Sequence, residues 1–452
     1  MIGLALHSLR HRMAAFAVTF VSVLLGTALI GSFATLIESA TGAVSSVDQE
    51  TLMIMGAVVG GWGTLIVLFS LASTLSVAVG QRNVEIALLR TVGTTPRQAR
   101  RMIRAETFVV ALVASAAGAV IAWVGGRALL AMIRQGGLVD GSVEYAGGGV
   151  SLALTILVVV LTSLFSATIV GRKATSGPAT IALSDSLSGR QRMRWWRVVT
   201  AILLIGYGLA MAIVTVTVTA DSDDPYNAMA TAGSNCILVG IGLAALSPVL
   251  LRWFSTAIRP VLGRTGPVGY LAAFNTSRRA PVLSGVLAPV IVFTAATIGT
   301  LMLVGIDGRT MLQGSPESDT VNMLNNVVVG MISLFAAIMV VNSFAAVVSH
   351  RRAEFTKLRL LGATPGLVRG SVVAEAGVVA ALGVVLGAVA SLATVVPFAI
   401  ARDEGGLPDG QLWLPLVLAA AAMALTVGAA SVAVRRTLAV AERTGTRAAM
   451  AA

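Results

Sequence analysis

Long apolar runs, separated by short polar segments, dominate this chain. Each run holds about 20 residues or more, which is enough to cross a bilayer as a helix. None alternates between apolar and polar positions as the strands of a membrane barrel do. The pattern predicts an all-α polytopic membrane protein with about ten transmembrane helices, at roughly 13–37, 53–79, 105–130, 150–170, 198–219, 230–251, 283–306, 322–348, 371–400 and 412–434.

Charge placement fixes the predicted orientation of these helices. Hydrophobic residues make up 56% of the 452 residues, and the net charge is +12 at pH 7. With the N-terminus inside, the inner segments hold 28 of the 32 Lys and Arg, and the outer segments hold 14 of the 20 Asp and Glu. Cytoplasmic loops carry an excess of basic residues. We therefore expect both chain ends in the cytoplasm of a multi-pass cell-membrane protein, with anionic lipids and not nucleic acid as neighbours.

Groups that carry catalysis or bind metals are scarce. Cys236 stands alone within a predicted span and suits a small core residue. The histidines His7, His11 and His350 lack metal-ligand spacing. The sequence contains no Gly-x-x-x-x-Gly-Lys-Ser/Thr loop that could hold phosphates. We therefore expect no enzyme activity, no metal and no cofactor on this chain.

Two polar stretches 269 residues apart match without a gap. Residues 82–96 read RNVEIALLRTVGTTP and residues 351–365 read RRAEFTKLRLLGATP. A solvated loop is the simpler alternative, and shared ancestry of two halves explains part of the match. Solvation alone does not require the same charges, Gly and Pro twice, so the pattern predicts a docking element for a cytoplasmic protein in each copy. Its candidate residues are Arg82, Glu85, Leu89, Arg90, Gly93, Thr95 and Pro96, and Arg351, Glu354, Leu358, Arg359, Gly362, Thr364 and Pro365.

Each motif predicts a short helix, a Gly-Thr-Pro turn and the next membrane helix. Glycine tolerates the positive φ common just after a helix end. Threonine is a good N-cap, and proline suits the first helical position. On the short helices we expect an apolar contact surface with a charged rim, formed by Leu88 and Leu89 with Glu85 and Arg90, and by Leu358 and Leu361 with Glu354 and Arg359.

One acidic residue follows each motif near the inner membrane edge. Glu106 and Glu375 lie ten residues after Thr-Pro in each copy. A carboxylate at that depth is costly unless it is paired. We expect a structural ion pair with an arginine, such as Arg101 or Arg104 in the first half, in preference to a proton relay.

The match extends to the whole layout of the chain. Residues 1–175 and 268–436 each read as a short basic interfacial segment followed by four spans. Four spans return the chain to the same side, so the two units are expected to be parallel repeats. Residues 176–267 form a linker with spans five and six, and residues 437–452 form a cytoplasmic tail. Gly118 and Gly383-x-x-x-Gly387 permit close helix packing.

The pattern Arg-x-x-Glu-x-x-x-Leu-Arg-x-x-Gly-x-Thr-Pro, followed by an acidic, Gly-rich span, resembles the FtsX-like permease family. These are membrane subunits of type VII ABC transporters, and they include macrolide exporters, lipoprotein-release permeases and bacitracin-resistance permeases. The resemblance covers both four-span halves. The two-copy layout is most similar to the bacitracin-resistance branch, which links the chain to bacterial antibiotic resistance.

The resemblance implies that a separate cytoplasmic ATPase docks on the loop after the second span of each repeat. Residues 82–96 and 351–365 would then bind two ATPase copies, with ATP held by that partner. Many family members carry a large extracytoplasmic domain, whereas the loops here, roughly 38–52 and 307–321, are short. Export or membrane extraction of a lipid or amphipathic substrate is therefore favoured.

Two other classes of function are open alternatives at this stage. An ion-coupled secondary transporter would need ionisable groups or broken helices at mid-depth. Pro289 and Pro397 could kink two spans, but no central acid accompanies them in the sequence. A membrane sensor or scaffold would bind the ATPase without moving cargo.

Overall fold

A computed structural model describes residues 13–42, 45–61, 83–135, 137–175, 195–220, 222, 225–310, 351–406 and 408–450, with single positions between 64 and 74 and between 330 and 348. Every regular element among these residues is a helix. The α-helices are α2 (Met13–Ala40), α3 (Ser46–Ile54), α5 (Asn83–Thr91), α6 (Pro96–Gln135), α7 (Val150–Ala174), α9 (Trp195–Val214), α10 (Pro225–Ala232), α11 (Asn235–Gly263), α12 (Pro267–Arg278), α13 (Ala280–Thr310), α15 (Arg352–Leu360), α16 (Pro365–Ala401) and α17 (Leu414–Met450).

Eight stretches of the described residues are long and apolar enough to cross a membrane. They confirm the predicted all-α polytopic membrane protein. The other two expected spans, 53–79 and 322–348, are described only in part, so the total of ten stays a prediction. The eight stretches are Thr19–Ala40, Pro96–Gln135, Val150–Arg172, Trp195–Thr219, Asn227–Gly263, Val282–Thr310, Pro365–Ala401 and Leu414–Leu438.

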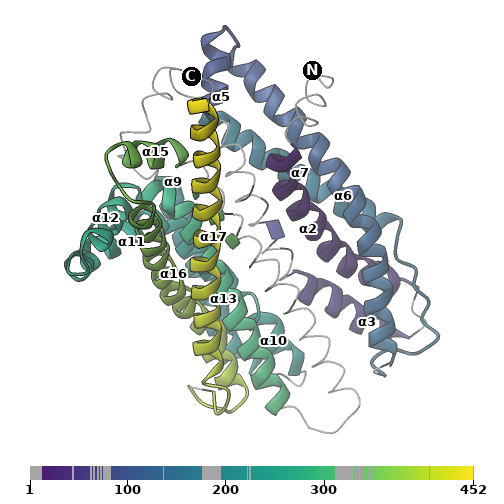
Figure 1. Ribbon diagram of the computed structural model, residues 1–452. Coiled ribbons are helices and arrows are strands. Elements are labelled where there is room, and N and C mark those ends of the chain that lie inside the picture. The colour runs from purple at the N-terminus through teal and green to yellow at the C-terminus, as the bar shows by residue number, and fades with distance from the viewer. Residues whose placement is uncertain are drawn as a thin grey trace.

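The long helices form two groups that run between the same two ends of the molecule (Figure 1). One group contains α2, α6 and α7, and the other contains α9, α11, α13, α16 and α17. The short helices α5 and α15 lie at the end where α2 begins and α17 finishes, while α3 and α10 lie at the opposite end. Both candidate docking motifs are therefore on one face of the molecule.

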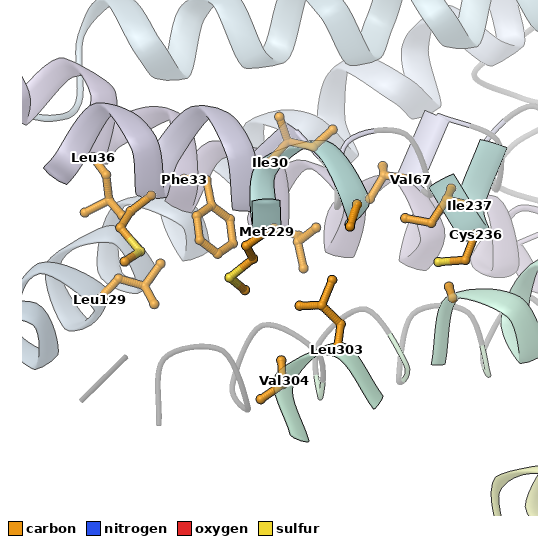
Figure 2. Packing of buried hydrophobic residues seen from close by; sticks show 14 of the residues in the cluster. Ile30, Phe33, Leu36, Val67, Leu129, Met229, Cys236, Ile237, Leu303 and Val304 are labelled. Atoms are coloured by element: carbon orange, nitrogen blue, oxygen red, sulfur yellow. The ribbon is translucent and has the colours of Figure 1, made fainter. Parts of the chain in front are cut away.

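A shared apolar core joins the two groups. Figure 2 shows Phe33 and Leu36 of α2 and Leu129 of α6 in the same buried cluster as Met229 of α10 and Leu303 of α13. Cys236 lies in this cluster and is fully buried, as a small core residue should be. Removing such side chains from water stabilises a protein by about 25 cal/mol per Å². Inside a bilayer the helices face lipid tails instead of water, so most of this stabilisation is absent. Close packing must then hold the helices together.

Glycines provide that close packing at equivalent positions of the two groups. A Cβ on Gly118 of α6 would lie 2.5 Å from the Leu24 carbonyl oxygen of α2. A Cβ on Gly387 of α16 would lie 2.5 Å from Thr294 Cβ and 2.9 Å from the Ile291 carbonyl oxygen of α13. Gly118 and Gly387 are 269 residues apart, the spacing of the two motifs. The α2–α6 and α13–α16 pairs therefore approach each other through the same kind of contact.

The Gly387 contact gives a first testable prediction. Gly387→Ala places a methyl group against the α13 backbone, so we expect a loss of about 1–3 kcal/mol of stability from overpacking. Gly377→Ala on the same helix is the matched control, because nothing lies within 4 Å of its added Cβ. The control should be neutral or slightly stabilising. Thermal unfolding of the purified variants in detergent measures both, and equal melting temperatures would contradict the packing role.

Ion pairs and hydrogen bonds to charged side chains join neighbouring helices at the end opposite the motifs. The Arg309 guanidinium at the end of α13 donates to both carboxylate oxygens of Glu404, at 3.1 and 3.0 Å. Arg402 donates to Asp307 of α13 at 2.6 Å. Two ion pairs thus join the end of α13 to the residues just after α16, in addition to the glycine contact between the two helices. In the first group, the Glu38 carboxylate of α2 accepts from the Ser151 backbone N–H at the start of α7, at 2.9 Å.

Candidate docking motifs and the charge network behind them

The first motif folds as a helix, a glycine turn and a second helix. Gly93 has a φ of 107° just after α5. Its N–H donates to the Arg90 carbonyl at 3.1 Å, and the Thr94 N–H donates to the Leu89 carbonyl at 3.0 Å. These two bonds form a Schellman ending, which satisfies the last carbonyls of α5. Thr95 then caps α6, because its hydroxyl accepts from the Gln98 N–H at 3.3 Å and the Gln98 side chain accepts from the Thr95 N–H at 2.9 Å.

The second motif repeats this geometry. Gly362 has a φ of 91° after α15. The Gly362 N–H donates to the Arg359 carbonyl and the Ala363 N–H to the Leu358 carbonyl, both at 3.0 Å. The Thr364 hydroxyl accepts from the Leu367 N–H at 3.2 Å and caps α16. The helix–turn–helix form predicted from sequence is therefore present in both copies.

Each short helix has one buried anchor and an exposed apolar tip. Ile86 of α5 packs against Ala99, Ile103 and Ala167. Phe355 of α15 packs in a cluster with Val368 and Val372 of α16. We define the first tip as Leu88, Leu89 and Val92, and the second tip as Leu360 and Leu361. Val92, Leu360 and Leu361 are 87%, 82% and 84% exposed.

The exposed residues of the two tips differ in part from the contact surface expected from the sequence. Leu358 packs against the cluster around Phe355 and does not form the open surface of α15. Leu360 and Val92 take the exposed positions, although they were not singled out from the sequence. Helical periodicity could have found them, because residues three or four positions apart share a face, whereas Leu360 and Val92 lie five and six positions after the buried anchors Phe355 and Ile86.

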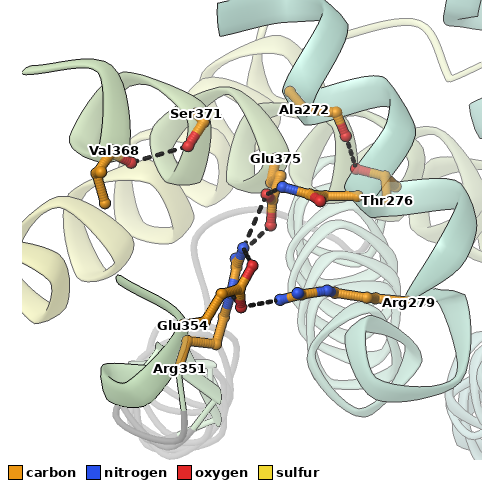
Figure 3. Close-up of polar contacts among 9 residues, drawn as sticks. Ala272, Thr276, Arg279, Arg351, Glu354, Val368, Ser371 and Glu375 are labelled. Atoms are coloured by element: carbon orange, nitrogen blue, oxygen red, sulfur yellow. Dashed lines mark hydrogen bonds and ion pairs between the residues drawn. The ribbon is translucent and has the colours of Figure 1, made fainter. Parts of the chain in front are cut away.

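A network of charged and polar side chains lies behind the second tip (Figure 3). The Arg351 guanidinium, next to α15, donates to the two Glu375 carboxylate oxygens of α16 at 2.5 and 3.1 Å. It also donates to Glu354 of α15 at 3.2 Å. Arg279, between α12 and α13, forms a second ion pair with Glu354. Asn275 of α12 donates to Glu375 at 2.7 Å, so three helices, α12, α15 and α16, meet in one network.

Comparison with known families identifies the chain. The model described as "FtsX-like permease C-terminal" matches residues 57–179 and 326–440, just over half of the sequence. The chain belongs to the FtsX-like permease family. Both docking motifs lie inside the matched regions, and the same family model accounts for both. No curated protein matches the chain.

Family membership and the membrane helices together settle the broad class. This FtsX-like permease is a multi-pass protein of the cell membrane and an ABC transporter permease-type component. Such permeases generally work with a cytoplasmic ATPase and are generally not enzymes themselves. In the part of the chain that the structure describes, His, Cys, Asp and Glu form no group of three or more that could hold a metal ion.

The charged groups of the network stabilise one another's ionised forms. Burial alone would raise the pKa of Glu354, but hydrogen bonds from Arg279 and Arg351 outweigh it and hold the pKa below its usual value. Burial acts to lower the pKa of Arg351, whereas the Glu375 and Glu354 carboxylates raise it overall. The Glu375 side chain is only 2% exposed and that of Arg351 9% exposed. Removing one partner would leave a buried charge without compensation.

Glu375, one of the two acidic residues expected near the inner membrane edge, lies in this network. Glu375 pairs with Arg351 of the docking motif, which lies 24 residues earlier in the chain. Glu354 is bound by two arginines and is only partly exposed. The geometry thus places Glu354 inside the network behind the second tip, whereas the sequence predicted it on the charged rim of the contact surface.

The first motif is described less fully than the second. Glu106 is 3% exposed on α6, at the position equivalent to Glu375. Arg90 is half-buried on α5, and Pro96 starts α6 as expected. Arg82 and the side chain of Glu85 lie outside the described residues, so their expected roles stay predictions.

Proposed function

We propose that this FtsX-like permease docks two copies of a cytoplasmic ABC ATPase, one on each tip, and couples their ATP hydrolysis to export or membrane extraction of a lipophilic or amphipathic substrate. The supporting observation is the pair of matched hairpins, each with exposed apolar side chains, at one end of the molecule. Arg90, Arg359 and Lys357 flank these side chains on the same short helices. Apolar side chains gathered in a polar surrounding are typical of protein interfaces.

The contacts behind the second tip support a path for the motion of a docked ATPase. Arg351 ties α15 to α16 through Glu375, and Glu354 ties α15 to Arg279 at the start of α13. Gly387 packs α16 against α13, and the Arg309–Glu404 and Arg402–Asp307 pairs join the end of α13 to the residues just after α16. When α15 is displaced, α13 and α16 therefore move together with it.

ATP binding acts in this proposal by changing which membrane conformation is favoured. A ligand shifts a conformational equilibrium only as far as it binds the two states differently. The two tips contact separate ATPase copies, so closure of the ATPase pair changes the distance between the hairpins. The helices attached to them follow, and the membrane part of the permease changes state.

The short connections between helices at the end opposite the motifs indicate which kind of substrate the permease handles. The described chain passes from Ala40 to Ser46, from Gln135 to Val150 and from Ala401 to Leu414 between successive helices. Connections of this length leave little chain to grip a large soluble cargo. A substrate that already resides in the bilayer fits them better, since the exposed faces of the helices are apolar.

Reconstitution tests this function and separates it from the alternatives. Proteoliposomes with the permease and its cognate ABC ATPase should move a fluorescent phospholipid analogue between leaflets when ATP is supplied. A hydrolysis-dead ATPase is the control and should support no movement. Movement driven by a proton gradient without ATPase would indicate a secondary transporter. ATP hydrolysis that responds to the permease but moves no cargo would indicate a sensor.

A further inference from the structure

We propose that α12 recognises anionic phospholipid in the inner leaflet and transmits lipid binding to the docking helix α15. This inference extends the proposed function, because α15 carries the second ATPase tip. The occupant of the α12 surface is a bilayer with anionic headgroups. The observations that support it are an aromatic stripe on α12, arginines near the end of α11 and in the turn before α12, and polar bonds between α12 and the network.

Helix α12 has one protein-facing side and one open side. It begins at Pro267 after Gly266, which has a φ of 83° and lets the chain reverse direction from α11. Gly269, Ala272, Ala273 and Thr276 are buried on one face. Tyr270, Phe274 and Arg278 are exposed on the other, at the spacing of successive helical turns. Figure 1 shows α12 at the edge of the molecule, where a bilayer can reach it.

The open face has the chemistry of a membrane interface. The Tyr270 and Phe274 rings stack with centroids 6.5 Å apart, and Trp253 of α11 is 81% exposed. Aromatic side chains are enriched at the level of lipid headgroups. Arg259 lies near the end of α11 and Arg264 in the turn before α12, and both are exposed. Arginines near the cytoplasmic leaflet attract anionic lipid headgroups, and guanidinium groups bind phosphate in a two-pronged geometry.

The protein-facing side of α12 is bonded directly to the docking network. Asn275 donates to Glu375 of α16 at 2.7 Å. Arg279, the residue that follows α12, forms the ion pair with Glu354 of α15. Lipid that holds α12 in place therefore also fixes Arg279, and with it one of the two arginines that bind Glu354. The consequence is a docking helix that is more rigid over an anionic inner leaflet than over a zwitterionic one.

Hydrogen exchange of the full-length permease in nanodiscs tests this inference without any ATPase. The discs contain either phosphatidylcholine alone or a mixture with phosphatidylglycerol. We expect amide exchange in residues 352–360 to slow several-fold with phosphatidylglycerol. Arg264→Gln should lose most of that response. Arg127→Gln is the matched control and should keep it, because Arg127 is an exposed arginine near the opposite end of α6, stacked on Trp123.

A second variant separates lipid binding from its transmission. Arg279→Gln should still retain phosphatidylglycerol in native mass spectra, yet residues 352–360 should exchange equally fast in both discs. Three results would each overturn the inference: equal exchange of the unaltered permease in the two lipids, an equal loss in Arg127→Gln, or a full lipid response in Arg279→Gln. Because no ATPase is present, such a failure leaves the docking proposal standing. A failure of docking likewise leaves the lipid response to be measured.

Discussion

Replacing Leu361 with Asp is expected to weaken ATPase association about 30-fold or more, and Val92→Asp combined with Leu361→Asp should abolish it. Truncating a central apolar anchor of an interface costs about 2 kcal/mol or more, and each 1.4 kcal/mol is a factor of ten in affinity. A carboxylate adds the cost of its desolvation in the contact. The side chains of Val92 and Leu361 are almost fully exposed, so the fold of the permease should be unaffected.

Co-purification with the cognate ABC ATPase, followed by titration in detergent, measures this effect. Leu412→Asp is the matched control, because Leu412 is also an exposed leucine but precedes α17 at the opposite end. Association should be unchanged in the control. If the double variant retained its ATPase with unaltered affinity, the tips would not be the docking surface and the proposed function would lose its main support.

Replacing Arg351 with Met is expected to destabilise the permease by about 3–5 kcal/mol, the cost of breaking a buried ion pair from one side. Arg351 binds Glu375 and Glu354 together, and the Glu375 carboxylate is almost completely buried. Without the guanidinium, Glu375 retains its bond from Asn275 but has lost its charged partner. The loss should exceed that of any exposed substitution on α15.

Thermal unfolding in detergent measures this loss, with Lys357→Met as the matched control. Lys357 is exposed on α15, and substitution of such a residue usually changes stability by less than about 0.5 kcal/mol. Glu375→Gln in the Arg351→Met background should restore part of the stability by removing the buried charge. A double-mutant cycle without coupling between Arg351 and Glu375 would show that their contact is incidental.

Local chemistry made the hairpins predictable. Gly93 and Gly362 adopt positive φ after a short helix, and Thr95 and Thr364 cap the next one. Capping and turn preferences depend on neighbours within four residues, so the sequence contains the information needed for this step. Apolar runs of membrane length made α6, α13 and α16 predictable for the same reason.

The roles of individual motif residues were less predictable. Leu358 and Leu361 are three residues apart and looked equivalent, but one packs against the Phe355 cluster and the other is exposed. Glu354 looked like a solvent-facing partner for an ATPase, but Arg279 approaches it from another helix, 75 residues earlier in the chain. Spacing along one helix cannot reveal a partner that a second helix supplies.

By itself the sequence determined the class of the protein, because the length of its apolar runs and the placement of its basic residues restrict it to a helical body in a membrane. It also determined the two hairpins, which short-range capping and glycine chemistry specify. Only the tertiary structure decided which side chains form the tips and that Arg351, Glu354, Glu375 and Arg279 form one network. The physical reason is that burial and long-range ion pairing depend on how α12, α13, α15 and α16 pack together, and no local pattern encodes that packing.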